Sequence, residues 1–302
     1  MKYRHSFHAG NFADVHKHVT LLALLAALQR KDKGLLYIET HAGRGLYDLG
    51  GADSQAGAEA RAGIGMLRAA HNTTAELAAL LAAGERACGS GAQLYAGSPL
   101  LAAQLLRPQD RGLCCEILPP ECRALERALR EFPRMHCLCA DGFAALSGHL
   151  PPVERRALVL IDPPYEHTST DLQRGLDAIT TILGRLANAV IALWYPIKDA
   201  RDLAPWLLRV AAQANAPTLN AQLWVHPTDS RVALNGSGLL LVNPPYEFDT
   251  RMQVWLPELA AALSATGAGT ANAGATASAG AAAAASAGAQ GGSSINWILH
   301  GH

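Results

Sequence analysis

The tetrapeptide Asp162-Pro163-Pro164-Tyr165 directly follows the apolar run ALVLI. A strand that ends in this way places a carboxylate, a carbonyl and an aromatic ring at the carboxyl edge of a sheet, where open α/β sheets bind ligands. Asp162 and the Pro163 carbonyl can both accept hydrogen bonds from one exocyclic amine, while the Tyr165 ring stacks on a planar base. A tight turn whose aspartate caps the next helix is the structural alternative. The motif favours a pocket in which the amine of a base meets an electrophile.

The loop 40–45 (THAGRG) is a second candidate, because it follows the apolar run LLYIE. Gly43 and Gly45 would let a ligand lie close to the backbone. A dinucleotide fingerprint is the alternative, but its third glycine is displaced, and a helical pattern replaces the acid expected about 20 residues later. A plain tight turn also remains open.

Acidic residues follow the ends of the later strands in an order that matches one ligand. Glu116 follows the second strand, Asp141-Gly142 follows the third and Asp162 follows the fourth. The Glu116 carboxylate would accept hydrogen bonds from both hydroxyls of a ribose, and Asp141 would face an adenine amine. Each acid alone is also consistent with a helix cap or a solvated strand end. Together the four strand ends predict S-adenosylmethionine as the cofactor.

Short apolar runs that end in a polar or acidic residue are typical of buried parallel strands. Such runs end at or near Glu39, Glu116, Asp141, Asp162, Tyr195 and Asn243. Helical patterns lie between them, as at 121–132 and 170–186. This alternation predicts a parallel α/β sheet.

The interval between Glu39 and Glu116 is too long for one crossover helix. Its segment 52–95 is rich in Ala and Leu and has a helical pattern. We therefore predict a small helical insertion between residues 1–51 and 96–263 of the main domain, and we expect it to wall one side of the ligand cleft.

Asn243-Pro244-Pro245-Tyr246 also follows an apolar run and could serve amine methylation. It lies two strands beyond Asp162, which already occupies the fourth strand end. We therefore interpret it as a structural turn.

The N-terminal segment 3–11 (YRHSFHAGN) is dense in stacking and hydrogen-bonding side chains, and His16 and His18 follow it. No metal is expected, because no cysteine and only Asp14 would complete a site. The segment predicts either an ordered arm or a lid over cofactor and substrate, with Asp14 capping the first helix.

The charge balance limits the partners. Lys and Arg together number 25, as do Asp and Glu, so the formal net charge is zero. This excludes a polycationic nucleic-acid coat and an acidic disordered tail. Any RNA contact must be local, and each candidate phosphate contact is also compatible with a solvated surface position. The candidates are Arg4, Lys17, Lys31, Lys33 and Arg44.

Other segments bear on location and order. The chain starts without a secretory signal and the apolar run 19–30 is too short to cross a bilayer, so we expect a cytoplasmic protein with no membrane segment. The six cysteines form no CxxC pair and are expected to be reduced core residues rather than a zinc site. Residues 264–294, almost entirely Ala, Gly, Ser and Thr, predict a mobile loop, and 295–302 are expected to return as a last edge strand.

Six motifs together resemble the RlmJ family of 23S ribosomal RNA adenine N6-methyltransferases: YRHSFHAGNFADVHKH, ETHAGRGLYDLG, YAGSPL, ADGF, LIDPPYE and ALWYPI. The resemblance runs from residue 3 to about residue 256 and resumes at INWIL. The Ala/Gly/Ser run at 264–294 is a departure, because it is much longer than the corresponding loop of the family.

The resemblance implies an α/β, Rossmann-like class I S-adenosylmethionine-dependent methyltransferase fold with a small inserted helical subdomain. It also implies Asp162 as the catalytic residue, assisted by Pro163 and Tyr165, with Tyr3 and Arg4 as substrate contacts. The cofactor contacts that it implies are His18, His41, Gly43, Gly45, Ser98, Glu116, Asp141, Gly142 and Asp162.

The reaction expected from these residues is in-line methyl transfer to N6 of a flipped-out adenine in 23S ribosomal RNA, with no metal and by a monomer. Three alternatives remain. A DNA adenine methyltransferase shares the Asp-Pro-Pro-Tyr motif, but this sequence has no basic target-recognition segment. A protein glutamine methyltransferase would be centred on Asn243. A non-catalytic module would only bind the cofactor and RNA.

Overall fold

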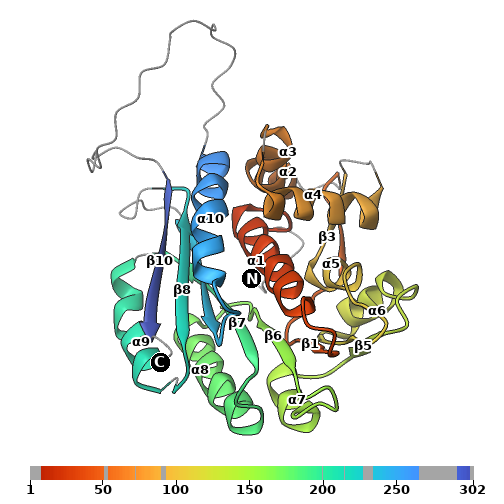
Figure 1. The fold of residues 1–302 in the computed structure, drawn as a ribbon. Helices are drawn as coiled ribbons and strands as arrows, with labels where there is room; N and C mark the ends of the chain where they lie inside the picture. The colour runs from red at the N-terminus through yellow and green to blue at the C-terminus, as the bar shows by residue number, and fades with distance from the viewer. Residues whose placement is uncertain are drawn as a thin grey trace, which may run out of the picture.

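The computed structural model describes residues 8–50, 54–71, 73–89, 93–198, 200–213, 215–226, 234–264 and 291–299 (Figure 1). The predicted substrate contacts Tyr3 and Arg4 and nearly all of the predicted mobile loop at 264–294 lie outside these residues. The strands are β1 (Leu36–Glu39), β2 (Leu46–Asp48), β3 (Leu94–Ala96), β4 (Arg111–Cys115), β5 (Met135–Leu138), β6 (Ala157–Ile161), β7 (Val190–Ile197), β8 (Thr218–Trp224), β9 (Gly236–Val242) and β10 (Gly292–Leu299). The helices are α1 (Phe12–Gln29), α2 (Ser54–Ala60), the π-helix η2 (Arg61–Gly65), α3 (Met66–Ala69), α4 (Ala75–Cys88), α5 (Ser98–Ala103), α6 (Pro119–Ala128), α7 (Gly142–His149), α8 (Thr168–Arg185), α9 (Ala200–Gln213) and α10 (Phe248–Ser264).

The main sheet has eight strands in the order β10-β8-β9-β7-β6-β1-β4-β5. Strands β5, β4, β1, β6 and β7 are parallel, whereas β9 is antiparallel to both β7 and β8, and β10 is antiparallel to β8. From β1, the chain first adds β4 and then β5 on one side of the sheet. It then returns to the other side of β1, where it adds β6 and then β7. The β1–β6 boundary is therefore a topological switch point, where such sheets bind ligands.

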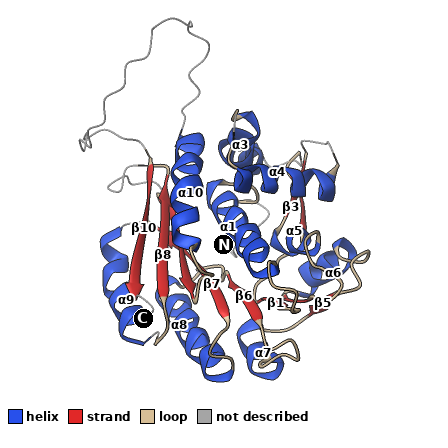
Figure 2. Ribbon diagram, viewed as in Figure 1, coloured by secondary structure: helices blue, strands red, loops and turns tan. Residues whose placement is uncertain are grey.

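Helices cover both faces of the sheet (Figure 2). One apolar core joins α1, α5, α6 and α10 to the sheet, and a second core joins α7, α8 and α9 to the opposite face. Because β6 is sandwiched between them, all five of its residues are buried, which explains its uninterrupted apolar sequence. The predicted α/β sheet is confirmed.

The strand ends lie close to their predicted positions. Strand β1 ends at Glu39, β4 ends one residue before Glu116 and β6 ends directly before Asp162. Strand β5 ends three residues before Asp141. The expectation of a parallel strand before Asn243 was wrong, since β9 pairs in antiparallel register with both of its neighbours, β7 and β8.

Two strands, β8 and β10, differ from what the sequence predicted. Strand β8 was not predicted, because its sequence TLNAQLW mixes polar and apolar residues. The C-terminal segment does return as the edge strand β10, as predicted, but the strand begins at Gly292 rather than at residue 295.

Between β1 and β4 the chain forms a small unit of helices with the two-stranded sheet β2–β3. This unit packs against the start of α1 (Figure 1). The amide of Ile64 in η2 donates to the Gly10 carbonyl at 2.8 Å. A Cβ atom on Gly63 would lie 2.1 Å from that same carbonyl oxygen, so only glycine allows this contact.

We expect Gly63→Ala to lower the free energy of unfolding by about 1–3 kcal/mol, because the added methyl must push the start of α1 away. Gly84 in α4 is the matched control, since nothing lies within 4 Å of a Cβ placed there. Gly84→Ala should raise stability by up to about 1 kcal/mol, because alanine is the better helix former. Urea denaturation measures both variants, and equal stability of Gly63→Ala and wild type would contradict the close contact.

Candidate active site

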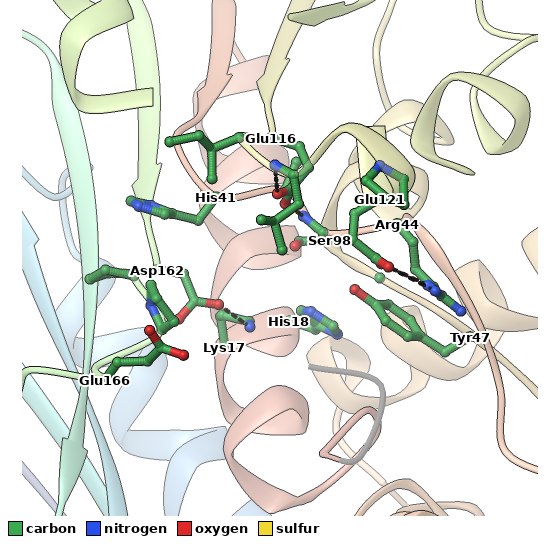
Figure 3. Close-up of a pocket in the computed structure, with 18 residues that line it drawn as sticks. Lys17, His18, His41, Arg44, Tyr47, Ser98, Glu116, Glu121, Asp162 and Glu166 are labelled. Carbon is green, nitrogen blue, oxygen red and sulfur yellow. Dashed lines mark hydrogen bonds and ion pairs between the residues drawn. The ribbon is translucent and has the colours of Figure 1, made fainter. Parts of the chain in front are cut away.

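A cavity of about 560 Å³ opens at the carboxyl ends of β1, β4 and β6 (Figure 3). It therefore lies at the switch point of the sheet. Several residues that the sequence predicted for cofactor or substrate line it together. They are His18, His41, Gly43, Ser98, Glu116, Asp162 and Pro163.

Glu116 joins the two loops that form one wall of the cavity. Its carboxylate accepts hydrogen bonds from the amides of Gly43 at 2.9 Å and Leu118 at 2.8 Å. Burial raises the pKa of Glu116, and these amide bonds oppose the rise. Gly43 has a φ of +63°, which favours glycine. A carboxylate has about four acceptor positions, so Glu116 can still accept a ligand hydroxyl.

Asp162 contacts Lys17, a buried lysine that the sequence indicated as a candidate RNA phosphate contact or a solvated surface residue. The Lys17 ammonium donates to Asp162 Oδ2 and also lies 2.8 Å from Asp14 Oδ1. The Lys17 side chain is only 4% exposed, so the expectation of a phosphate contact was wrong. Burial alone would lower the pKa of Lys17, but the two carboxylates outweigh burial and raise that pKa well above its ordinary value. Among the described residues, Asp162 Oδ1 accepts no hydrogen bond, which leaves it available to a ligand.

Glu39 is a further acidic group behind the cavity that the sequence analysis treated only as a strand end. It is fully buried and accepts hydrogen bonds from Ser98 Oγ at 2.5 Å and the Tyr37 hydroxyl at 2.8 Å. Burial raises the pKa of Glu39 to about 7, against the effect of these donors and of Lys17. The sequence signal for Glu39 was its position as an acid directly after an apolar run. That signal did not predict the burial of Glu39, because the burial depends on α5, which is distant in the sequence.

Two histidines line the cavity in different environments. His18 is buried and shares a hydrogen bond of 2.7 Å between its Nδ1 and the Tyr95 hydroxyl. Burial lowers the pKa of His41 to about 4, so this ring is neutral near pH 7. Its Nδ1 lies 2.8 Å from Thr40 Oγ1, and its ring contacts Phe143 edge to face.

Tyr165, the predicted stacking residue, does not line the cavity. Its side chain is buried, its hydroxyl donates to the Trp194 carbonyl and its ring meets the Trp194 ring at 5.4 Å between centroids. Its φ of +53° marks the strained corner that follows the two prolines. The structure therefore places this ring beside the cavity and not in it.

Three other predicted cofactor residues also lie outside the cavity lining. Asp141 caps α7 by accepting from the Phe143 amide at 2.9 Å, and its pair with Arg174 at 2.7 Å lowers the Asp141 pKa despite partial burial. Gly142 packs against the backbone, since a Cβ there would lie 2.0 Å from the Thr40 carbonyl oxygen. Gly45, with a φ of +77°, faces α6.

The other N-terminal and basic candidates lie at the two ends of α1 and in the loop after β1. Asn11, and not Asp14, is the N-cap of α1, because its side chain accepts from the Asp14 amide at 3.0 Å. Arg44 lines the cavity but forms a bidentate ion pair with Glu121, both contacts being 2.8 Å. The exposed segment 31–33 follows the far end of α1, at the opposite edge of the sheet from Asp162, so Lys31 and Lys33 do not flank the cavity.

The second Pro-Pro motif is a structural turn, as predicted. The Asn243 side-chain amide donates to the carbonyls of Ala187 at 2.9 Å and Ala189 at 3.0 Å. Because β9 runs antiparallel to β7, this motif lies at the edge of the sheet opposite to Asp162.

Within the part of the chain that the structure describes, no three His, Cys, Asp or Glu side chains are grouped to hold a metal ion. Among the same residues, no helix combines the length and apolar character needed for a membrane span.

Comparisons with known proteins agree on one family. A family model described as ribosomal RNA large subunit methyltransferase D, RlmJ, matches residues 32–274. The ribosomal RNA large subunit methyltransferase J of Haemophilus influenzae is 36% identical over 272 residues, covering 89% of this chain and 96% of that protein. The protein of the same name from Escherichia coli is 37% identical, with 90% and 97% covered. The crystal structure of protein LPL1258 from Legionella pneumophila is 28% identical, with a TM-score of 0.80 over 96% of this chain and 98% of that one.

The sheet order and the cavity at its switch point define a protein with a Rossmann-like methyltransferase fold. The chain belongs to the RlmJ family of ribosomal RNA large subunit methyltransferases.

The environment of Glu39 predicts a pH-dependent stability. Because its folded pKa is raised above the unfolded value, its favourable contribution is complete below the unfolded pKa and is lost as pH rises through about 7. Relative to Glu39→Gln, the wild type should lose about 2 kcal/mol of unfolding free energy between pH 5 and pH 8. Chemical denaturation of both proteins across this range measures the difference. A difference that stays constant with pH would show that Glu39 does not titrate there.

Proposed function

We propose that this protein transfers the methyl group of S-adenosylmethionine to N6 of an adenine in 23S ribosomal RNA, in the cytoplasm. The observation that carries the proposal is the Asp162 carboxylate, whose Oδ1 accepts no hydrogen bond from the residues that the structure describes and which shares its cavity with Glu116. Membership of a ribosomal RNA methyltransferase family supports the RNA substrate. The chemistry of the Asp-Pro-Pro corner, which offers two acceptors to one exocyclic amine, supports the adenine N6 position.

The cavity fits the proposed cofactor in its volume and its donor set. Its volume of about 560 Å³ falls within the usual range for small-molecule sites. Glu116 can accept from the ribose hydroxyls through its remaining lone pairs. Ile117 and Leu118 also line the cavity and are 57% and 47% exposed, so they offer an apolar surface to the adenine ring. When bound, the cofactor supplies an electrophilic methyl group on a sulfonium.

The Asp-Pro-Pro corner would hold the amine that accepts this methyl group. The N6 amine is a weak nucleophile, because its lone pair is delocalised into the ring. Hydrogen bonds from its two N–H groups to Asp162 Oδ1 and the Pro163 carbonyl would direct the lone pair away from the ring and stabilise the positive charge that develops on nitrogen. The nitrogen would lose one of these protons once the methyl group is attached. Lys17 supports this geometry, because it occupies Oδ2 and leaves Oδ1 for the amine.

Other predicted substrate contacts are supported to different extents. Stacking of the target base on Tyr165 would require the tyrosine side chain to move. Its hydroxyl would then lose the hydrogen bond that it donates to the Trp194 carbonyl. Tyr3 and Arg4 precede residue 8 and remain proposed substrate contacts. They precede α1, which begins at Phe12 and carries Lys17.

We expect Asp162→Asn to lower the single-turnover rate of methyl transfer at least about 100-fold, with cofactor affinity largely retained, by analogy with the loss of one oriented polar group in other active sites. The rate is measured as tritiated methyl incorporated into protein-free 23S ribosomal RNA. Asp177→Asn is the matched control, since Asp177 is exposed on α8 and binds only Gln173 among side chains of the described residues. An unchanged rate in Asp162→Asn would remove this carboxylate from the mechanism.

The same assay with DNA and with a release-factor protein separates the substrate classes. Digestion of the labelled product to nucleosides locates the methyl group. Label in N6-methyladenosine from RNA supports the proposal. Label only in DNA, only in protein, or nowhere contradicts it.

A further inference from the structure

The Lys17 ammonium is shared by two carboxylates, and only one of them lines the cavity. Asp162 is the cavity residue, whereas Asp14 precedes Lys17 by three residues on α1 and is 3% exposed. Burial of a second carboxylate is costly unless it is paired and hydrogen-bonded. The distance of 2.8 Å from Asp14 Oδ1 to Lys17 Nζ provides the pairing.

Asp14 is fixed in place by the first turn of its own helix. Its Oδ2 accepts from the Gly10 amide at 3.0 Å, and its own amide donates to Asn11 Oδ1 at 3.0 Å. The positive end of the helix dipole also stabilises a negative charge in this turn. Asp14 is therefore a rigid anionic support for the lysine, and Figure 3 shows the Lys17 ammonium reaching from α1 to Asp162.

The sharing of one ammonium decides what this support does. Lys17 Nζ contacts Asp14 and Asp162 together, so its position against Asp162 depends on both carboxylates. The negative charge of Asp14 also makes the potential at Asp162 more negative than it would be without Asp14. Positive charge that develops next to Asp162 is therefore stabilised more strongly when Asp14 is present.

We propose that Asp14 is a positioning residue for methyl transfer, which holds Lys17 against Asp162 Oδ2 without allowing the ammonium to cancel the negative charge at the cavity. This inference rests on the proposed function, because it assigns Asp162 to the reacting amine. A residue with only a packing role would affect the rate independently of Lys17, whereas Asp14 would act through Lys17.

The test is a double-mutant cycle with Asp14→Asn and Lys17→Met. An asparagine oxygen can still accept from the Gly10 amide, so the variant removes mainly the charge that faces Lys17. We expect Asp14→Asn to lower the single-turnover rate about 10-fold at saturating S-adenosylmethionine, with the cofactor dissociation constant within about twofold. In the Lys17→Met background the same change should alter the rate less than about twofold, because coupled residues are not additive.

Two results would overturn the proposal. One is a wild-type rate in Asp14→Asn, and the other is an equal rate loss with and without Lys17, which would mean that Asp14 acts independently of the lysine. Asp177→Asn controls for the loss of one carboxylate from the chain, and thermal unfolding checks that each variant is folded.

A second measurement does not depend on catalysis. In carbon-13 NMR of the folded protein, the Asp162 carboxyl signal, assigned with Asp162→Asn, should move when Asp14 is changed to Asn and should not move in Asp177→Asn. An unmoved signal contradicts the sharing of Lys17 even if Lys17→Met fails to fold. If the wild type transfers no methyl group to RNA, the proposed function fails. The carbon-13 signal of the Asp162 carboxyl group still shows whether Asp14 affects Asp162.

Discussion

One buried ammonium ties the first helix of the chain to the end of its central strand. Lys17 lies on α1, and Asp162 follows β6, so their ion pair spans the switch point at which the cavity opens. Removal of one partner from a buried ion pair typically costs about 3–5 kcal/mol, because the other charge stays buried and unpaired. The position of α1 is therefore a condition for the site, and the contact between Gly63 and Gly10 links that position to the inserted helical unit.

The parallel part of the sheet and several of the cavity residues could be predicted because their signals are local. An apolar run that ends in an acid, or in Asp-Pro-Pro, marks a strand end whatever the rest of the chain does, and parallel strands bring such ends to one edge. Glu116 and Asp162 meet in the cavity for this reason. The roles of Lys17 and Glu39 could not be predicted in this way, since each depends on partners from distant segments. Helix α1 buries charged residues as well as apolar ones. The positions of its charged residues therefore do not mark a face exposed to solvent, and the burial of Lys17 could not be predicted from them.

The two Pro-Pro motifs show where a local signal stops being sufficient. Both follow apolar strands and both place a non-glycine residue at positive φ, Tyr165 in one and Asn243 in the other. They lie at opposite edges of the sheet only because β9 is antiparallel. Counting strand ends distinguished the motif that lines the cavity from the one that does not, although the direction of β9 itself was predicted wrongly. The burial of Tyr165 against Trp194 depends on β7, and the motif carries no information about that packing.

The last strand of the sheet has a consequence for how the chain could be rebuilt. A Cβ atom on Gly291 would lie 1.8 Å from Ser264 Oγ, so the end of α10 and the approach to β10 are in contact. Two anchored points that touch can be joined by linkers of very different length, because each doubling of a flexible loop adds only about 0.6 kcal/mol of closure entropy. The contact between Gly291 and Ser264 therefore does not by itself require a connection of one particular length. A fluorescent or affinity module could be built in between them, with β8, β9 and β7 separating β10 from the β6 end that forms the cavity.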